Sequence, residues 1–298
     1  MRRFELLEPA TLEEAIGLLD PEDPGVRALA GATALIPMMK SGVFQPTRLV
    51  SLRRLEGELR GVHAENGGGL RIGALTTLSE LEHSPGVRAS APVITRALRT
   101  LSNVRIRNVA TLGGHLGHGD PHMDLPPILM TLNARVRAVG PKGQRWIDMN
   151  DLAVGYYQTA LEHGELIADV HVPVQPPGVC TAYAKFTALS ADDWPTVGVA
   201  AWFRIDGSQI AEARVAISAA TERPTRVSAT EAILTGALPA PETFATAAEA
   251  AAEDVETLAD IRGSAAYKRE MIRVYVRRAL AQALAGRDTG NSDGYSRS

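Results

Sequence analysis

The chain has 298 residues with 45% hydrophobic and 22% charged side chains, which is typical of a folded protein of about two or three domains. A formal charge of −3 argues against nucleic acid or anionic lipid as a partner, and the single cysteine excludes an internal disulfide and an iron–sulfur cluster ligated by this chain alone. No apolar run resembles a signal sequence or a membrane span, so we expect a cytoplasmic protein without membrane insertion.

The first residues alternate strand and helix patterns. Residues 4–8 predict a strand, and a capping box at 11–14 opens a helix. A second strand at 26–30 is followed by a turn and a short helix, and a third strand covers 48–52. We therefore expect residues 1–56 to form a small parallel βαβ subdomain.

Residues 57–175 predict a larger mixed subdomain. Its expected elements, in chain order, are a strand at 70–74, a capping box at 77–80, helices at 92–101 and 125–133, a hairpin at 134–148 and a strand at 164–174. The QPPG segment at 175–178 then permits neither a helix nor a central strand. It is the strongest domain boundary in the sequence.

Downstream, the pattern predicts an α+β domain at 176–286. Antiparallel strands are expected at 181–186, 196–205 and 212–220, with a hairpin turn at Asp206–Gly207 between the last two. Three helices follow. The last, near 265–285, has a buried stripe of five residues: Ile272, Val276, Ala279, Leu280 and Ala283. The polar tail at 287–298 predicts disorder.

The stretch TLGGHLGHGDPHMDLP, residues 111–126, concentrates three of the seven histidines. It permits two interpretations. A metal site would use His115, His118, Asp120, His122 and Asp124. The four glycines of the stretch and Pro121 argue against a regular helix, however, and the spacing matches no common zinc motif.

An anion site fits this stretch better. Adjacent Gly113 and Gly114 allow backbone N–H groups to approach a phosphate, and Thr111 adds a hydroxyl. A second glycine turn with a threonine, LAGATAL at 29–35, follows a predicted strand. The two turns together can bind a dinucleotide pyrophosphate. Neither has the GxGxxG pattern of a Rossmann fold, and no GxxxxGK[ST] motif of a triphosphatase is present.

Four segments in order resemble the FAD-binding medium subunits of molybdenum hydroxylases, a family that includes carbon monoxide dehydrogenase, 4-hydroxybenzoyl-CoA reductase and xanthine dehydrogenase. The resemblance covers about residues 3–285. The segments are LAGATALIPMMKSG with FQPTRLVSL, IRNVATLGGHLGHGDPHMDLPPIL, YAKF ahead of DDWP, and DIRGSAAYKREMIRVYVRRAL.

The resemblance implies an α+β protein. Two subdomains would form a FAD-binding fold of the vanillyl-alcohol-oxidase (PCMH) type, followed by a C-terminal domain of antiparallel strands and helices. It implies that two loops bind the pyrophosphate and neighbouring parts of FAD, that Asp124 lies near the cofactor, that Lys185 lies beside the flavin, and that Ile167 packs on it. The implied cofactor-binding residues are Ala30, Gly31, Ala32, Thr33, Ala34, Leu35, Thr111, Gly113, Gly114, His115, Asp120, Asp124, Ile167 and Lys185.

Several positions depart from the family pattern. Ala32 replaces a glycine, where a positive φ would cost about 1 kcal/mol or more, and Ala34 replaces a small polar residue. His115 replaces an asparagine or aspartate. TALSADD after Lys185 lacks the arginines common in relatives, and the cysteine-rich insertion of some relatives is absent. The chain itself should therefore contain no iron–sulfur centre.

The resemblance implies an electron-transfer subunit of an oxidoreductase. It would take electrons from a [2Fe-2S] small subunit and pass them from FAD to an external acceptor. A large subunit would carry the molybdenum cofactor and the substrate chemistry, so we assign this chain no catalytic residue and no metal ligand. The expected assembly is a dimer of heterotrimers.

Other interpretations stay open at this point. A cofactor-free scaffold of the same fold is one, and a metal-dependent hydrolase using His115, His118 and His122 is another. Asp124 could instead cap a helix, Lys185 could be a solvated charge and Ile167 could be a core residue. The arginines 269, 273 and 277 on the last helix form either a solvated face or a docking face.

Overall fold

The computed structural model describes residues 3–290, which form two compact units. The N-terminal unit comprises the chain up to Gly119 together with Ala134–Val174. The C-terminal unit comprises Asp120–Asn133 and the chain from Gln175 onward. The second unit thus resumes at the QPPG segment, but Asp120–Asn133 packs with it rather than with its neighbours in sequence. Among the described residues, no helix has the length and apolar character needed to cross a membrane.

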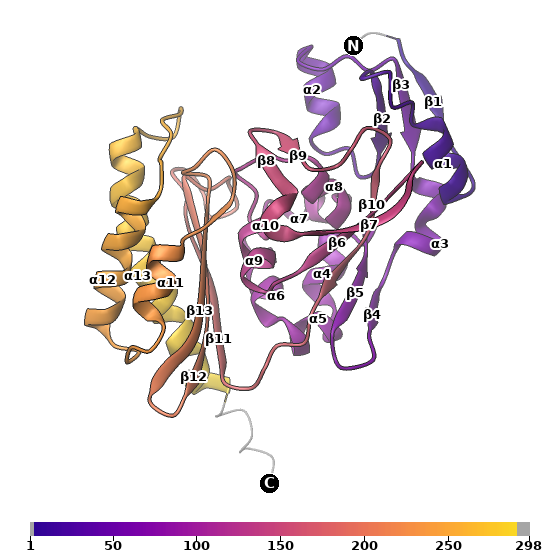
Figure 1. The fold of residues 1–298 in the computed structure, drawn as a ribbon. Helices are drawn as coiled ribbons and strands as arrows, with labels where there is room; N and C mark the ends of the chain where they lie inside the picture. Colours follow the sequence, from indigo (N-terminus) through magenta and orange to yellow (C-terminus); the bar gives the residue numbers. More distant parts are fainter. Residues whose placement is uncertain (1–2, 291–298) are drawn as a thin grey trace. The chain divides into compact units, whose positions relative to one another are not determined.

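A small parallel sheet opens the N-terminal unit, as the sequence predicts (Figure 1). Its strand order is β1-β3-β2, with both pairings parallel. Thr11 caps the first helix by accepting a hydrogen bond from the Glu14 N–H at 3.1 Å. The elements are β1 (Glu5–Leu7), α1 (Leu12–Leu18), β2 (Val26–Leu29), α2 (Leu35–Ser41), β3 (Arg48–Ser51), η1 (Arg53–Leu55) and α3 (Glu56–Leu59).

A larger antiparallel sheet with the order β4-β5-β10-β6-β7 completes this unit. Its strands are β4 (Val62–Ala64), β5 (Leu70–Gly73), β6 (Arg135–Gly140), β7 (Gly143–Asp148) and β10 (Leu166–Val172), and a separate pair comprises β8 (Ala153–Gly155) and β9 (Gln158–Thr159). The helices are α4 (Leu78–His83), α5 (Pro85–Ser90), α6 (Pro92–Leu98), α7 (Val104–Arg107), α8 (Leu112–Gly117) and α10 (Met149–Leu152). One hydrophobic core includes Val26 and Val50 of the small sheet and Val139 and Leu166 of the larger one.

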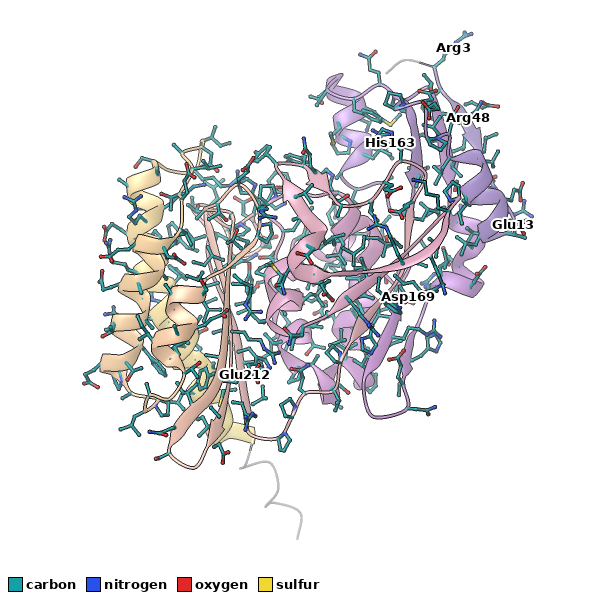
Figure 2. The ribbon with its side chains drawn as sticks, in the orientation of Figure 1. Arg3, Glu13, Arg48, His163, Asp169 and Glu212 are labelled. Carbon is teal, nitrogen blue, oxygen red and sulfur yellow. The ribbon has the colours of Figure 1, made fainter. Side chains whose placement is uncertain are left out.

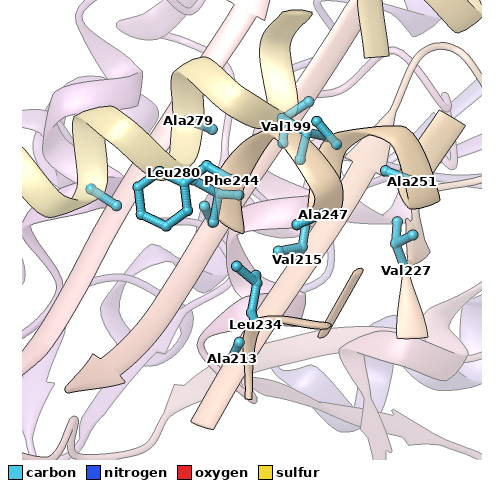
Figure 3. Close-up of a cluster of buried hydrophobic side chains, with 14 of the residues drawn as sticks. Val199, Ala213, Val215, Val227, Leu234, Phe244, Ala247, Ala251, Ala279 and Leu280 are labelled. Atoms are coloured by element: carbon cyan, nitrogen blue, oxygen red, sulfur yellow. The ribbon is translucent and has the colours of Figure 1, made fainter. Parts of the chain in front are cut away.

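The C-terminal unit contains the antiparallel sheet β11-β12-β13-β14. The strands are β11 (Val179–Phe186), β12 (Val197–Asp206), β13 (Gln209–Ser218) and β14 (Thr225–Arg226). Three helices cover one face of it (Figure 1): α11 (Ser228–Leu234), α12 (Pro241–Asp254) and α13 (Ala265–Gly290). Figure 3 shows part of the core between them, where Phe244, Ala247, Ala279 and Leu280 of the helices meet Val199 and Val215 of the strands. Helix α9 (Leu125–Thr131) also packs on β12 and β13.

Three local predictions need correction. The β12–β13 turn comprises Gly207 and Ser208, because Asp206 still pairs with Gln209. Helix α13 extends to Gly290, so the predicted tail does not begin at residue 287, and its residues 291–298 lie outside the described part. The stretch 112–117 forms a short helix despite its glycines. By contrast, all five residues of the predicted stripe on α13 are buried, as expected.

Candidate functional site

Residues 30–35 connect β2 to α2 and present unbonded backbone donors. Within the described part of the chain, no acceptor is hydrogen-bonded to the N–H groups of Ala32, Thr33, Ala34 or Leu35. All four residues are half-buried. Ala32 has a φ of +56°, in the left-handed region that the sequence comparison with family patterns anticipated. Successive N–H groups without acceptors form a place where an anion can bind.

Gly31 brings this loop against the second one. A Cβ atom at this position would lie 2.1 Å from the Val109 carbonyl oxygen and 2.9 Å from the Ala110 Cα. A backbone atom cannot yield as the end of a side chain can, so only glycine fits. On the other side of the contact, a Cβ at Gly114 would lie 3.7 Å from the Ala30 Cβ. The structure therefore places the two predicted loops side by side within the N-terminal unit.

The second loop, residues 111–115, does not present the free backbone N–H donors expected of an anion site. The Leu112 and Gly113 N–H groups donate to the Thr76 and Ala74 carbonyls at 2.9 and 2.8 Å. The Gly114 N–H donates to the Thr111 hydroxyl oxygen at 3.2 Å, because Thr111 caps α8. These N–H groups are engaged within the protein, so the free donors belong to the first loop. His115 is buried on α8, with its own N–H bonded to the Thr111 carbonyl at 2.9 Å.

Asp124, Tyr183 and Lys185 form a buried cluster in the C-terminal unit. The Tyr183 hydroxyl donates to Asp124 Oδ1 at 2.6 Å, and Lys185 Nζ lies 3.4 Å from Oδ2. Lys185 also donates to the Asp193 carbonyl at 3.1 Å. Although Asp124 precedes α9, its side chain makes no capping bond. Asp124 is thus not a helix cap, and Lys185, whose side chain is only 7% exposed, is not a solvated charge.

The strand register explains this cluster. Tyr183 and Lys185 are two residues apart on β11 and share one face of the sheet. Gly198 of β12 pairs with Lys185, and Ser218 of β13 pairs with Gly198. A Cβ at Gly198 would lie 2.5 Å from both the Tyr183 and the Ser218 hydroxyl oxygens. The missing side chain at Gly198 therefore makes the space that the Tyr183 hydroxyl occupies.

The pKa directions in this cluster follow from burial and pairing. Burial raises the pKa of Asp124 above 3.8, while Lys185 and the Tyr183 hydrogen bond act in the opposite direction. Burial, and then the negative charge of Asp124, raise the pKa of Tyr183 well above 10. The tyrosine is therefore a neutral donor at any physiological pH.

The segment before Asp124 is fixed by a second buried network. Asp120 Oδ1 accepts a bond from the His122 N–H and contacts Nδ1 of that ring, both at 2.9 Å. His122 Nε2 lies 3.1 Å from Asp260 Oδ2, and the same oxygen accepts a bond from Lys268 at 2.8 Å. Lys268 is fully buried and also donates to the Ala219 carbonyl. These bonds explain why this segment packs with the C-terminal unit.

The Asp260 carboxylate in that network is stabilised in its charged form. Burial raises the pKa of Asp260, but hydrogen bonds from Lys268, the Arg262 N–H and His122 outweigh it, so the pKa lies below 3.8. Sequence reasoning missed Lys268 and Asp260 as partners of His122, since Asp260 is 138 residues away from it. It also missed Tyr183 as a partner of Asp124, because that contact depends on the strand register and on the space at Gly198.

Ile167 lies on β10, where its side chain is 6% exposed. Two residues along the strand lies buried Asp169, which is labelled in Figure 2. Asp169 accepts hydrogen bonds from Arg137 on β6, from Nε at 2.8 Å and also from Nη2. The structure places Ile167 in the N-terminal unit with the two loops, and Asp120, Asp124 and Lys185 in the C-terminal unit.

Two further observations concern the alternatives left open by the sequence. Among residues 3–290, no group of three or more histidine, cysteine, aspartate or glutamate side chains is arranged to bind a metal ion. On α13, Arg273 pairs with Glu249 at 2.6 Å and with Glu270. That arginine is part of an ion-paired helix surface.

Two family models match the chain. Residues 2–175 match the FAD binding domain in molybdopterin dehydrogenase, and residues 181–283 match the CO dehydrogenase flavoprotein C-terminal domain. The carbon monoxide dehydrogenase medium chain of Hydrogenophaga pseudoflava is 34% identical over 283 residues, covering 95% of this chain and 98% of the relative. The nicotine 6-hydroxylase medium subunit of Paenarthrobacter nicotinovorans is 33% identical over 277 residues, covering 93% and 96%.

Solved structures give the same result. Carbon monoxide dehydrogenase from Hydrogenophaga pseudoflava, in a form that lacks the Mo-pyranopterin moiety, superposes with a TM-score of 0.91 at 35% identity and covers 95% of this chain and 98% of that one. Quinoline 2-oxidoreductase from Pseudomonas putida 86 superposes with a TM-score of 0.89 at 30% identity and covers 96% and 98%. The mixed α+β architecture expected from the sequence is confirmed.

Proposed function

The chain belongs to the FAD-binding medium subunits of the molybdopterin hydroxylases, and from this premise we propose that it is the electron-output subunit of its complex. In this proposal it accepts electrons from a [2Fe-2S] small subunit, holds them on FAD and delivers them to an external acceptor. A large subunit carries the molybdenum cofactor, and two heterotrimers form the assembly. The observation that carries the proposal is the run of unbonded N–H groups at residues 32–35 beside the Gly31 contact.

The first loop fits the pyrophosphate of FAD. Four successive N–H groups without acceptors, in a loop whose Ala32 has left-handed backbone, suit a doubly charged anion. Ala30 and Gly31 set the loop against residues 109–114. We propose that Thr111, Gly113, Gly114 and His115 contribute mainly by shaping the wall beside the anion, because the N–H groups of residues 113–115 are already bonded.

The second part of the proposal concerns the flavin ring. FAD supplies a carrier that accepts two electrons and gains negative charge or protons when reduced. We propose that Lys185 and Asp124 lie beside that ring, that the Lys185 ammonium stabilises the added charge, and that Ile167 packs against it. In this proposal Asp120 acts at a distance, by fixing the segment that carries Asp124 through its bonds to His122. Bound FAD requires no acid or base from this chain.

Substrate choice would belong to the partner subunits. The relatives named above are a carbon monoxide dehydrogenase chain and a nicotine hydroxylase subunit, which differ in substrate while sharing about a third of their residues with this chain. A scaffold that has lost its cofactor is disfavoured, since the first loop retains both the glycine contact and the free donors.

Electron flow can be tested with the reconstituted complex. We would load the chain with FAD, mix it with the chemically reduced iron–sulfur subunit, and follow the flavin absorbance in a stopped-flow instrument. Bleaching of the flavin on mixing, and its return when an acceptor is added, are expected. A variant that cannot bind FAD, Gly31→Ala, is the control. FAD that stays oxidised beside the reduced partner would contradict the proposed route.

A further inference from the structure

We propose that Tyr183 is a positioning residue that keeps Asp124 ionised, so that the Asp124–Lys185 pair is electrically neutral. The reduction potential of the flavin is then lower than it would be beside an unbalanced Lys185 charge. This inference rests on the proposed function. Tyr183 contacts Asp124 within the buried cluster of the C-terminal unit.

The two oxygens of Asp124 have unequal partners. Oδ1 accepts a hydrogen bond from the Tyr183 hydroxyl at 2.6 Å, whereas Lys185 Nζ lies 3.4 Å from Oδ2 and is shared with the Asp193 carbonyl. The shorter bond is the one from tyrosine. Without it, a buried carboxylate would depend on one long contact with an ammonium group, and a carboxylate in that position favours protonation.

Tyr183 is well suited to a fixed donor role. Its raised pKa keeps the phenol protonated, so it stabilises charge on Asp124 without adding charge of its own. Its hydroxyl occupies the space above Gly198 next to the Ser218 hydroxyl, and residues on three paired strands define its position. A fixed donor of this kind is preorganised, so no rearrangement is needed when the charge nearby changes.

Other charged side chains around α9 have partners of their own. Arg214 of β13 pairs with Glu212 and donates to the Thr131 carbonyl at 3.0 Å. On the segment preceding Asp124, His122 lies between Asp120 and Asp260. Among the described side chains, the charge that acts on Asp124 is that of Lys185. If Asp124 becomes neutral, a net positive charge remains there.

The sign of the effect follows from this balance. A net positive charge beside the flavin favours the reduced, more negative form, so the midpoint potential rises. Asp124→Asn should raise it at any pH at which wild-type Asp124 is ionised. Tyr183→Phe should raise it increasingly as the pH falls, because Asp124 then takes up a proton more readily. Lys185→Met removes the positive charge and should lower the potential at the higher pH values, where Asp124 stays ionised.

The experiment measures the midpoint potential of bound FAD by spectroelectrochemistry as a function of pH, in the complete complex. The variants are Tyr183→Phe, Asp124→Asn and Lys185→Met, with Tyr275→Phe on α13 as the matched tyrosine control. If Tyr183→Phe does not fold, Gly198→Ala replaces it, since the added methyl displaces the hydroxyl from Asp124. The control should keep the wild-type potential.

Two failures can be told apart. Wild-type protein that binds no FAD would contradict the proposed function, and this inference with it. Wild-type protein that binds FAD, with Tyr183→Phe or Gly198→Ala retaining the wild-type potential at every pH, would overturn the role of Tyr183 alone. Shifts of equal sign in Asp124→Asn and Lys185→Met would overturn the charge argument, because a merely structural loss has no reason to change sign.

Discussion

Replacing Ala32 by glycine should stabilise the protein. Ala32 has a φ of +56°, where a side chain with a Cβ costs about 1–2 kcal/mol relative to right-handed backbone and glycine costs almost nothing. Glycine also makes the unfolded chain more flexible, which offsets about 0.4–1 kcal/mol of this gain. Subtracting the midpoint of the second range from that of the first predicts that Ala32→Gly raises the free energy of unfolding by roughly 0.8 kcal/mol.

The assay is urea unfolding of the two proteins side by side, followed by circular dichroism. Ala153→Gly, at the start of β8, is the control: its φ of −89° is unstrained extended backbone, so glycine there should cost about 0.4–1 kcal/mol. The two substitutions should therefore have opposite signs. A loss of stability in Ala32→Gly as large as that in Ala153→Gly would refute the claim that Ala32 is strained.

Three further outcomes follow from the structure. Gly31→Ala should cost about 1–3 kcal/mol in urea unfolding and abolish FAD retention on dialysis, because its methyl would lie 2.1 Å from the Val109 carbonyl oxygen. Arg137→Met leaves buried Asp169 without its ion pair and should lower the free energy of unfolding by about 3 kcal/mol. A loss below about 1 kcal/mol would contradict this, because it would be the loss expected for a solvent-exposed ion pair. The pKa of Asp260 lies below 3.8 in the folded protein, so its contribution to stability is present above that pH and is lost as the pH falls through the folded-state pKa. Unfolding free energies measured from pH 7 to pH 3 should therefore show a deficit of Asp260→Asn that shrinks toward acid, and a constant deficit would contradict the ion-pair account.

Local sequence patterns predicted most elements of the fold. The parallel layer, the hairpin at 135–148 and the buried stripe of α13 each depend on short-range periodicity or turn chemistry, which the sequence displays directly. Helix α8 escaped prediction because a Thr111 cap and bonds to the Ala74 and Thr76 carbonyls outweigh the low helix propensity of its glycines.

Long-range partners account for the rest. Asp124 and Lys185 were named through a family resemblance, but Tyr183 requires knowledge of the strand register and of the space above Gly198. The network of His122 with Asp260 joins residues that no local pattern relates. The same applies to the packing of Asp120–Asn133 with the C-terminal unit, which tertiary contacts determine.

The central claim is that the loops around Gly31 and Thr111 bind FAD for electron transfer. The most direct test is the FAD content of the purified chain, expressed alone and with its small and large partner subunits, measured after denaturation by absorbance and chromatography. The account predicts stoichiometric FAD in the wild-type complex and its loss in Gly31→Ala. No FAD in either wild-type preparation, even after FAD is added, would contradict it.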